Sequence, residues 1–317
     1  MKIVFMGTPD FSVPALDALV EGGHQVALVV SQPDKPKGRG KAMQMTPVKA
    51  RAVELGIPVA TPLKVRGNEE FLNQLREIAP DVIVVIAYGQ IITKDVLELP
   101  RYGCVNIHAS LLPQYRGAAP IQWAVIDGEK VSGVTTMQMD AGIDTGDMLD
   151  KVEVALDEDE TGGSLFDKLA TAGGKLILET LAKIENGTSV PIPQTGESNY
   201  VGTISKAMGE IDWSKSAVVI ERLIRGLNPW PSAYTWMDGK TLKLWRAKVN
   251  AVPTDLSCTP GQIIRVDKDS FTVQCGEGTL TILELQLEGK KRMDADAFLR
   301  GYSVTSGWVL GRGADVE

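Results

Sequence analysis

The sequence has few of the residues that most often carry metal, redox or imidazole chemistry: its 317 residues include only three cysteines and two histidines. Cys104, Cys258 and Cys275 are an odd and widely spaced set, which predicts neither a disulfide framework nor a zinc site and is typical of a reducing cytoplasm. Imidazole chemistry has to use His24 or His108. Because no His/Cys cluster has ligand spacing, we expect no metal site.

Long apolar runs are also missing. The longest, Val82–Ala87, has the length of a strand and falls well short of the ~18 residues that cross a bilayer. Met1–Gly7 goes directly into a strand-like run and a turn, without the longer apolar region and cleavage site of a signal peptide. We therefore expect a cytoplasmic protein with no membrane segment.

The composition is that of an ordinary globular protein. Apolar residues make up 44% and charged residues 23%, which excludes disordered, collagen-like and coiled-coil classes. The length predicts two domains, at about 150 residues each. The net charge is −7, yet Pro33–Arg51 holds six basic residues against one acid, Asp34. This basic loop could meet a polyanion locally, although the overall acidity does not suggest nucleic acid.

The first half alternates strands and helices, which predicts an α/β fold with a mainly parallel, right-handed sheet. Gly187–Ser205 is rich in Pro, Gly, Ser and Thr and is typical of a linker. Five short strands after it predict a small antiparallel barrel of the OB-like kind. We place the domains at residues 1–188 and 206–317, with a linker over 189–205. Strands are expected over 2–6, 25–31, 82–87, 103–108, 134–139, 233–237, 242–249, 261–266, 270–274 and 280–287, and helices over 12–21, 46–55, 69–78, 164–186 and 214–226.

Two polar residues end one of the predicted strands. The alternation of a strand puts Asn106 and His108 on one face and Ile107 on the other. Ligands of an open parallel sheet bind outside the carboxyl ends of its strands, so an amide and an imidazole would face the same crevice. Together they could hold a developing oxyanion and exchange a proton. A capped strand end with a satisfied histidine is the alternative.

Cys104 lies on the same predicted face and raises the possibility of a thiol nucleophile. At ~3.3 Å per residue it is ~13 Å from His108 along the strand, too far for a hydrogen bond. We interpret Cys104 as a small core residue.

An acid-rich segment follows another strand. A carboxylate beside His108 would orient the ring and favour its charged form. Asp140, Asp144 and Asp147 are all candidates, and each could equally be a turn or cap residue. Spacing alone does not select among them. The turn at Gly7 carries neither a dinucleotide-binding nor a P-loop pattern.

Several motifs together resemble the folate-dependent formyltransferase family, and within it the branch that formylates methionyl-tRNA. The central ones are SLLPQYRGAAPI at Ser110–Ile121, directly after Asn106–His108, and GVTTMQMDAGIDTGDM at Gly133–Met148. The resemblance extends nearly end to end. It also includes GTPDF at Gly7–Phe11, QPDKPKGRGK at Gln32–Lys41 and LNPWP at Leu227–Pro231.

The resemblance implies a Rossmann-like catalytic domain over 1–188 and an OB-like tRNA-binding domain over 206–317. It also assigns residues. The family's catalytic set falls on Asn106, His108 and Asp144. Its folate-contacting residues fall on Ser110, Leu111, Leu112 and Pro113. Its basic tRNA-contacting loop falls on Lys35, Lys37, Arg39 and Lys41.

The reaction implied by the resemblance moves a formyl group from 10-formyltetrahydrofolate to the α-amino group of methionine on initiator tRNA, without a metal. Negative charge that builds on the formyl oxygen would be held by Asn106 and protonated His108. We expect a monomer. Two alternatives remain: a formyltransferase acting on a purine precursor or an amino sugar, and a nucleic-acid-binding protein without catalysis.

Overall fold

The computed structural model describes residues 1–37, 42–250 and 257–311, and the chain forms two compact units. In the described part of the chain, no helix combines the length and the apolar composition needed to cross a bilayer. Unit 1 consists of Met1–Pro120, Val131–Ala155 and Phe166–Val201, and unit 2 of Ile121–Lys130, Leu156–Leu165 and the chain from Gly202 onward.

Unit 1 is built on a seven-stranded sheet whose central strands are parallel. At one edge, β9 and β10 are added antiparallel. Every residue of β6 is buried, as expected for a strand covered on both faces. The predicted α/β class with a mainly parallel sheet is confirmed. The order is β10 (Met148–Ala155), β9 (Val131–Gln138), β7 (Cys104–His108), β6 (Val82–Ile86), β1 (Lys2–Gly7), β2 (Gln25–Val30) and β5 (Val59–Ala60).

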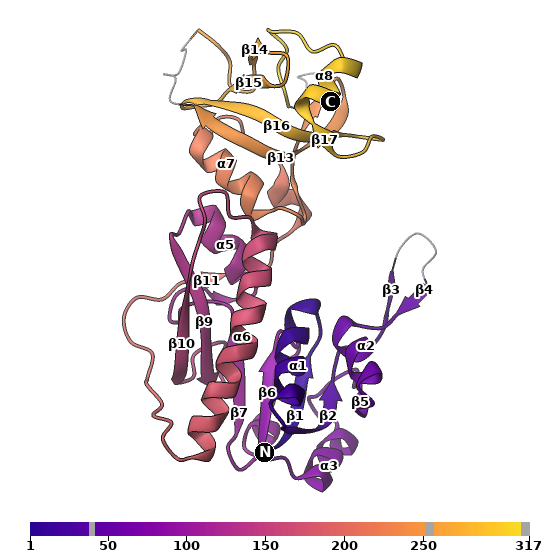
Figure 1. Cartoon of the computed structure of the whole chain (residues 1–317), viewed down its shortest axis with the longest axis vertical. Coiled ribbons are helices and arrows are strands. Elements are labelled where there is room, and N and C mark those ends of the chain that lie inside the picture. The colour runs from indigo at the N-terminus through magenta and orange to yellow at the C-terminus, as the bar shows by residue number, and fades with distance from the viewer. Residues whose placement is uncertain (38–41, 251–256, 312–317) are drawn as a thin grey trace. The chain divides into compact units, whose positions relative to one another are not determined.

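Helices cover both faces of this sheet (Figure 1). On one face, α6 packs closely on β7 and α1. A Cβ at Gly173 would lie 3.0 Å from Cγ2 of Ile107, and a Cβ at Gly174 would lie 2.9 Å from the carbonyl oxygen of Pro14. These approaches explain two glycines inside a long helix. The helices are η1 (Asp10–Ser12), α1 (Val13–Glu21), α2 (Pro47–Glu54), α3 (Glu69–Ile78), α4 (Lys94–Leu97) and α6 (Gly162–Glu185), most of which belongs to unit 1.

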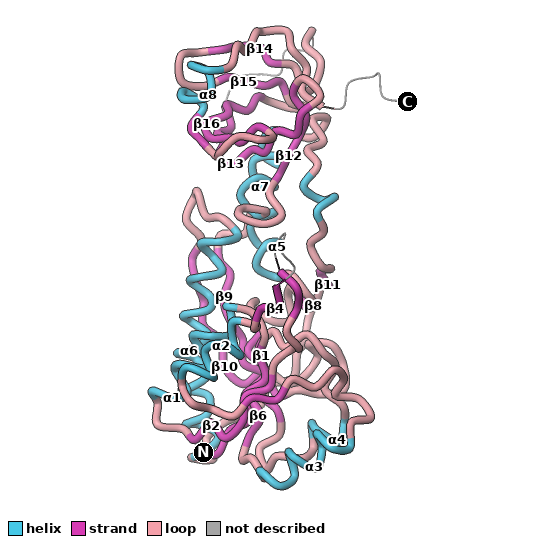
Figure 2. Tube along the Cα trace, turned by 90° about the vertical axis from the view of Figure 1, so that its right-hand side faces the viewer, coloured by secondary structure: helices cyan, strands magenta, loops and turns pink. Residues whose placement is uncertain are grey.

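Two short ribbons lie outside the main sheet. β3 (Lys35–Lys37) pairs antiparallel with β4 (Ala42–Gln44), so the basic loop forms a hairpin at its base. β8 (Arg116–Gly117) pairs in parallel with β11 (Tyr200–Val201), and the two are side by side in Figure 2. The second ribbon ties the predicted linker to a loop that follows β7.

Unit 2 contains an antiparallel sheet, as predicted for the second domain. The five expected strands are present, with ends displaced by at most two residues. The path is β12 (Ala233–Met237), β13 (Lys240–Asn250), β16 (Thr279–Leu287), β15 (Phe271–Gln274) and β14 (Ile263–Val266), with β17 (Met293–Asp294) beside β16. The helices are α5 (Pro120–Asp127), η2 (Lys206–Gly209), α7 (Ala217–Gly226) and α8 (Ala295–Gly301).

The helix α5 belongs to unit 2 although it lies early in the sequence. Arg222 on α7 donates from Nη1 to the carbonyl oxygen of Asp127 over 3.1 Å. A Cβ at Gly226 would lie only 2.5 Å from Cγ1 of Ile126, so α7 and α5 pack closely. The division at residues 188 and 206 stays a prediction.

Candidate active site

Asn106 and His108 lie on one face of β7 near its carboxyl end. Both side chains are largely buried, with 9% and 6% of the residue exposed. In register, Asn106 is flanked by Val85 on β6 and Met137 on β9. The side-chain amide of Asn106 makes no hydrogen bond with any residue that the structure describes. The amide is not among the described buried polar atoms that lack a partner, so it reaches solvent and is open to a ligand.

The imidazole of His108 is held from both of its nitrogens. Nε2 lies 2.9 Å from the carbonyl oxygen of Tyr115. Because a carbonyl only accepts, Nε2 is the donor and carries a proton. Nδ1 lies 3.7 Å from Oδ2 of Asp144. That separation is too long for a hydrogen bond, so the carboxylate faces the ring without bonding to it.

The structure distinguishes Asp144 from Asp140. Both carboxylate oxygens of Asp140 accept from the hydroxyl of Thr145, at 2.8 and 2.9 Å, as a turn residue does. Asp144 turns toward His108 and accepts from the backbone N–H of Gly117 over 2.8 Å. Its backbone has a φ of 54°, in the left-handed region that aspartate tolerates better than most residues.

The expected folate loop is internally bonded. The hydroxyl of Ser110 donates to the carbonyl oxygen of Gln114 over 2.6 Å. Thr135 on β9 accepts from the N–H of Leu112 at 3.1 Å and donates to the carbonyl oxygen of Ser110 at 2.7 Å. Lys151 on β10 donates to the carbonyl oxygen of Leu112 over 2.5 Å. The loop is therefore fixed from the sheet side.

Its four side chains have different environments. Ser110 and Leu112 are 1% and 0% exposed, so Leu112 is a core residue. Leu111 and Pro113 are half-buried. We expect a ligand here to meet Leu111, Pro113 and the loop backbone, and Leu112 to act by anchoring the loop.

Cys104 is buried at the amino end of β7, as expected of a core residue. Its thiol donates to the carbonyl oxygen of Val96 over 3.6 Å, and burial raises its pKa to about 12. A neutral, enclosed thiol is a poor nucleophile, which argues against the thiol mechanism.

The basic loop is described only in part. Lys35 is exposed on β3, and the backbone of Lys37 lies in the same strand. Arg39 and Lys41 lie outside the described residues. At the base of the hairpin, Lys49 forms an ion pair with Asp34 at 2.7 Å.

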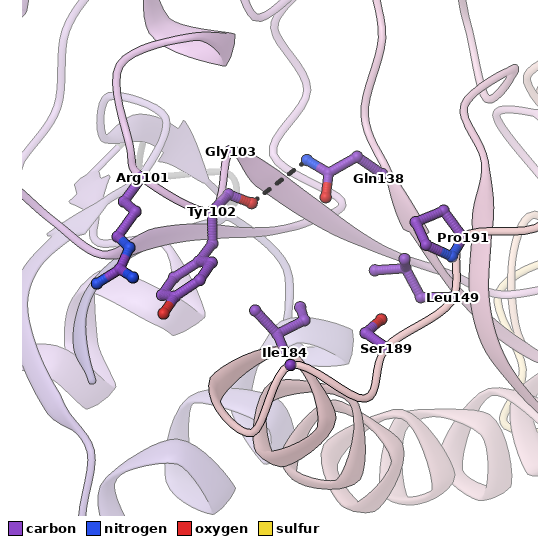
Figure 3. Close-up of a pocket in the computed structure, with 9 residues that line it drawn as sticks. Arg101, Tyr102, Gly103, Gln138, Leu149, Ile184, Ser189 and Pro191 are labelled. Atoms are coloured by element: carbon purple, nitrogen blue, oxygen red, sulfur yellow. Dashed lines mark hydrogen bonds between the residues drawn. The ribbon is translucent and has the colours of Figure 1, made fainter.

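A hollow of about 450 Å³ is lined by Gly103, which directly precedes β7, and His108 is not part of its lining (Figure 3). Gln138 lines it and donates to the carbonyl oxygen of Tyr102 over 3.4 Å. Its lining offers no acid or base comparable to His108. The described residues also contain no cluster of three or more His, Cys, Asp or Glu side chains able to hold a metal ion.

Comparison with known proteins identifies the family. The formyl transferase profile matches residues 1–181, and the profile of the formyl transferase C-terminal domain matches residues 203–303. The chain belongs to the formyl transferase family. The resemblance noted in the sequence is thereby confirmed.

Curated relatives and solved structures agree with this family. Methionyl-tRNA formyltransferase of Agathobacter rectalis is 58% identical over 308 residues, which are 97% of this chain and 98% of the relative. The Lachnospira eligens protein of the same name is 54% identical over 98% of this chain and 100% of the relative. A sugar 3N-formyl transferase crystallised with dTDP and 5-N-formyl-THF has a TM-score of 0.67 at 20% identity, over 92% of this chain and 99% of that one. At that identity the likeness shows the fold alone.

Some residues of this formyl transferase site have no sequence signal. The carbonyl of Tyr115 and the N–H of Gly117 act through the backbone, which any residue type could supply. Gln194 reaches the carbonyl oxygen of Asp144 from the predicted linker, 50 positions further along the chain. Thr135 could have been suggested by its place on a strand next to β7, since buried threonines need partners.

Proposed function

We propose that this protein transfers the formyl group of 10-formyltetrahydrofolate to the α-amino group of methionine on initiator methionyl-tRNA, for translation initiation. One observation carries the proposal: the amide of Asn106, which has no partner among the described residues, shares a strand face with His108, whose ring is held beside Asp144. The near full-length identity to methionyl-tRNA formyltransferases supports the choice of acceptor.

When bound, the folate supplies an electrophilic formyl carbon that the amine attacks directly, so no covalent enzyme intermediate is needed. Asn106 donates from its amide to the formyl oxygen as negative charge builds there. His108, charged, offers the N–H of Nδ1, because Nε2 is already engaged by Tyr115. Asp144 faces the ring and takes up the proton of the attacking amine, directly or through water. The bond between the formyl carbon and N10 of the folate then breaks, the proton passes on to N10, directly or through water, and tetrahydrofolate leaves.

The folate-binding role is assigned to the loop from Ser110 to Pro113. Support comes from its rigidity, since Thr135 and Lys151 fix its backbone, and from the half-buried Leu111 and Pro113 beside it. A preformed loop with apolar side chains and a few fixed polar groups is suited to a heteroaromatic ligand.

The tRNA-binding role is assigned to the hairpin of β3 and β4, with Lys35, Lys37, Arg39 and Lys41. The hairpin concentrates positive charge on an acidic chain, and Lys35 is exposed. Lysines contact phosphates as point charges, whereas an arginine also stacks on bases or makes paired hydrogen bonds.

The cytoplasm is proposed as the location and the monomer as the working state. Two of the three cysteines, Cys104 and Cys275, are buried with neutral thiols, which suits a reducing compartment. Analytical ultracentrifugation tests the second proposal: a dimer at micromolar concentration would contradict it.

An acceptor assay tests the function. Purified protein and 10-formyltetrahydrofolate are offered initiator methionyl-tRNA, elongator methionyl-tRNA, a purine ribonucleotide precursor and an amino sugar nucleotide. We expect formyl transfer to initiator methionyl-tRNA above the others. Preferred transfer to a small acceptor would contradict the proposal and favour the alternative reaction. His108→Ala serves as the control, and it should lower single-turnover transfer by about 10²–10³-fold while folate still binds.

A further inference from the structure

The segment before the last piece of unit 2, residues 189–201, is bonded along two loops that flank His108. We call it the connecting segment. Ile192 exchanges two backbone hydrogen bonds of 2.8 Å with Met148, at the end of the acid-rich loop. Further along, the carbonyl oxygen of Asn199 accepts from the N–H of Arg116 over 3.0 Å, next to the β8–β11 ribbon. The segment therefore contacts both loops that meet the imidazole.

Gln194 of this segment bridges the two loops with its side-chain amide. Its Oε1 accepts from Nη2 and Nε of Arg116, at 2.7 and 3.1 Å. Its Nε2 donates to the carbonyl oxygens of Asp144 and Gly146, both at 2.8 Å. All four hydrogen-bonding positions of the amide are used. Because a guanidinium only donates, the amide oxygen must face Arg116, and the nitrogen must face the Asp144 loop.

Asn199 holds the second loop in a comparable way. Its Oδ1 accepts from the backbone N–H of Tyr115 over 2.5 Å. The carbonyl oxygen of the same Tyr115 then accepts from Nε2 of His108. The chain of contacts from the connecting segment to the imidazole is thus two bonds long.

Tyr115 and Asp144, which face the two nitrogens of the imidazole, have a backbone conformation that residues with a side chain rarely adopt. Tyr115 has a φ of 56° and Asp144 a φ of 54°. Such conformations persist only where the surroundings over-determine them, and they cluster at functional sites. In each case a side chain of the connecting segment bonds to that residue's own backbone: Asn199 to Tyr115, and Gln194 to Asp144.

We infer that Gln194 is a positioning residue for the formyl transfer proposed above, with Asn199 as its counterpart. It holds the carboxylate of Asp144 at its distance from Nδ1 of His108 by fixing the backbone on either side of Thr145. It touches neither the formyl donor nor the acceptor. The inference rests on the proposed function for its kinetic part, but its geometric part concerns the free protein.

Three variants separate the contacts. Gln194→Glu keeps an oxygen for Arg116 but loses both N–H donors and places a negative charge against two carbonyl oxygens. Gln194→Ala removes both sets of bonds. Thr195→Ala is the matched control, because Thr195 is the exposed neighbour and has no side-chain bond among the described residues. Urea unfolding of each variant shows whether the fold is retained.

Two readouts are measured. The first is the ¹H–¹⁵N spectrum of the imidazole groups in the free protein; with only His24 and His108 in the chain, His24→Gln assigns both signals. The second is kcat and KM for transfer to initiator methionyl-tRNA. We expect Gln194→Glu and Gln194→Ala to shift the His108 signals and to lower kcat about 10- to 100-fold. The KM of each Gln194 variant for initiator methionyl-tRNA should stay within about threefold of the wild-type value. Thr195→Ala should match the wild type in both readouts.

Several results would overturn the inference. Unchanged His108 signals in both Gln194 variants mean that the amide does not position the ring, whatever the rates. Shifted signals with an unchanged kcat mean that the position does not matter to the reaction. A wild type that formylates no methionyl-tRNA contradicts the proposed function instead, and the imidazole spectra still test the geometry on their own.

Discussion

Nδ1 of His108 and Oδ2 of Asp144 lie 3.7 Å apart in a site where 6% of the histidine is exposed. At that distance and burial the carboxylate acts on the ring mainly through its charge, since no short hydrogen bond joins them. The same carboxylate oxygen is fixed by the N–H of Gly117. The carboxylate therefore faces the ring at a fixed position without occupying Nδ1.

Replacing Asp144 by Asn should keep the shape of the site and remove the charge. Without the carboxylate the proton of the attacking amine has no acceptor, so kcat should fall at least about 100-fold. Rapid-quench transfer assays measure it. Asp147→Asn is the control, because it removes a carboxylate from the same loop without touching His108. Equal losses in both variants would show that the loop, and not the Asp144 charge, matters.

The buried thiol of Cys104 should have no part in catalysis. Because burial raises its pKa to about 12, the thiol is neutral at physiological pH and should resist alkylation in the native protein. We expect iodoacetamide to modify the half-exposed Cys258 first, as read by mass spectrometry, with activity retained. Cys104→Ser should also stay active. Inactivation in step with modification of Cys104 would restore the thiol mechanism.

The free energy of unfolding should fall in alkaline solution. The pKa values of Cys104 and Cys275 are raised by burial from 9.0 to about 12. Above about pH 9 these thiols ionise in the unfolded chain but keep their protons in the folded protein, so the unfolded state binds fewer protons and stability falls. Each thiol should contribute about 1.4 kcal/mol per pH unit up to about pH 12.

Urea unfolding at about pH 8 and about pH 10 measures this loss. Cys104→Ala should reduce the difference between the two pH values by roughly 1.4 kcal/mol, one thiol's share over one pH unit. Cys275→Ala should reduce the difference by a similar amount, because burial raises the pKa of that thiol to about 12 as well. A wild-type protein equally stable at both pH values would contradict the prediction.

Lys151→Met should loosen the loop proposed to hold folate. The change keeps much of the apolar stem but leaves the carbonyl oxygen of Leu112 without its donor, which costs about 1–3 kcal/mol for a buried group. We expect the KM for 10-formyltetrahydrofolate to rise about tenfold and the KM for tRNA to stay constant. Lys175→Met is the control, since both lysines line the same groove of about 690 Å³ beside α6. Similar effects from the two variants would indicate that the positive charge of the groove matters, and not the hydrogen bond from Lys151 to Leu112.

Arg39→Ala should weaken transfer to methionyl-tRNA and leave folate affinity alone. Each lost phosphate contact should reduce the salt dependence of tRNA binding by about one unit of slope. The comparison that decides uses a minimal aminoacyl acceptor without the tRNA body, on which wild type and variant should be nearly equal. If they differ there as much as on whole tRNA, the hairpin supports folding or chemistry and not tRNA binding.

The sequence predicts the fold well where the hydrophobic periodicity and the capping residues indicate the same element. The helix over 69–78 is found at those bounds, because Asn68 caps it and an amphipathic pattern fills it. β10 was not predicted: Met148–Ala155 follows directly on an acid-rich loop and carries its own charges at Asp150, Lys151 and Glu153. The two-residue strands β8 and β11 are too short to leave any periodic signal.

The candidate site was predictable at Asn106 and His108, whose directions follow from strand alternation. Residue spacing did not select Asp144 over Asp140, because that choice depends on a left-handed backbone at Asp144 that a loop sequence does not specify; only the family resemblance assigned it. The role of Gln194 could not be predicted from the sequence, for another reason. Its partners are set by tertiary packing, and a segment rich in Pro, Gly, Ser and Thr suggests only a connection.

The chain passes between the two units five times, because Ile121–Lys130 and Leu156–Leu165 belong with the later residues. No single junction in the gene can therefore exchange one unit for that of a relative. A graft that begins at Gly202 would leave behind the stretch that contains Asp127 and Ile126, the partners of Arg222 and Gly226 on α7. Recombination within this family, natural or engineered, should succeed only when all three pieces of unit 2 are moved together.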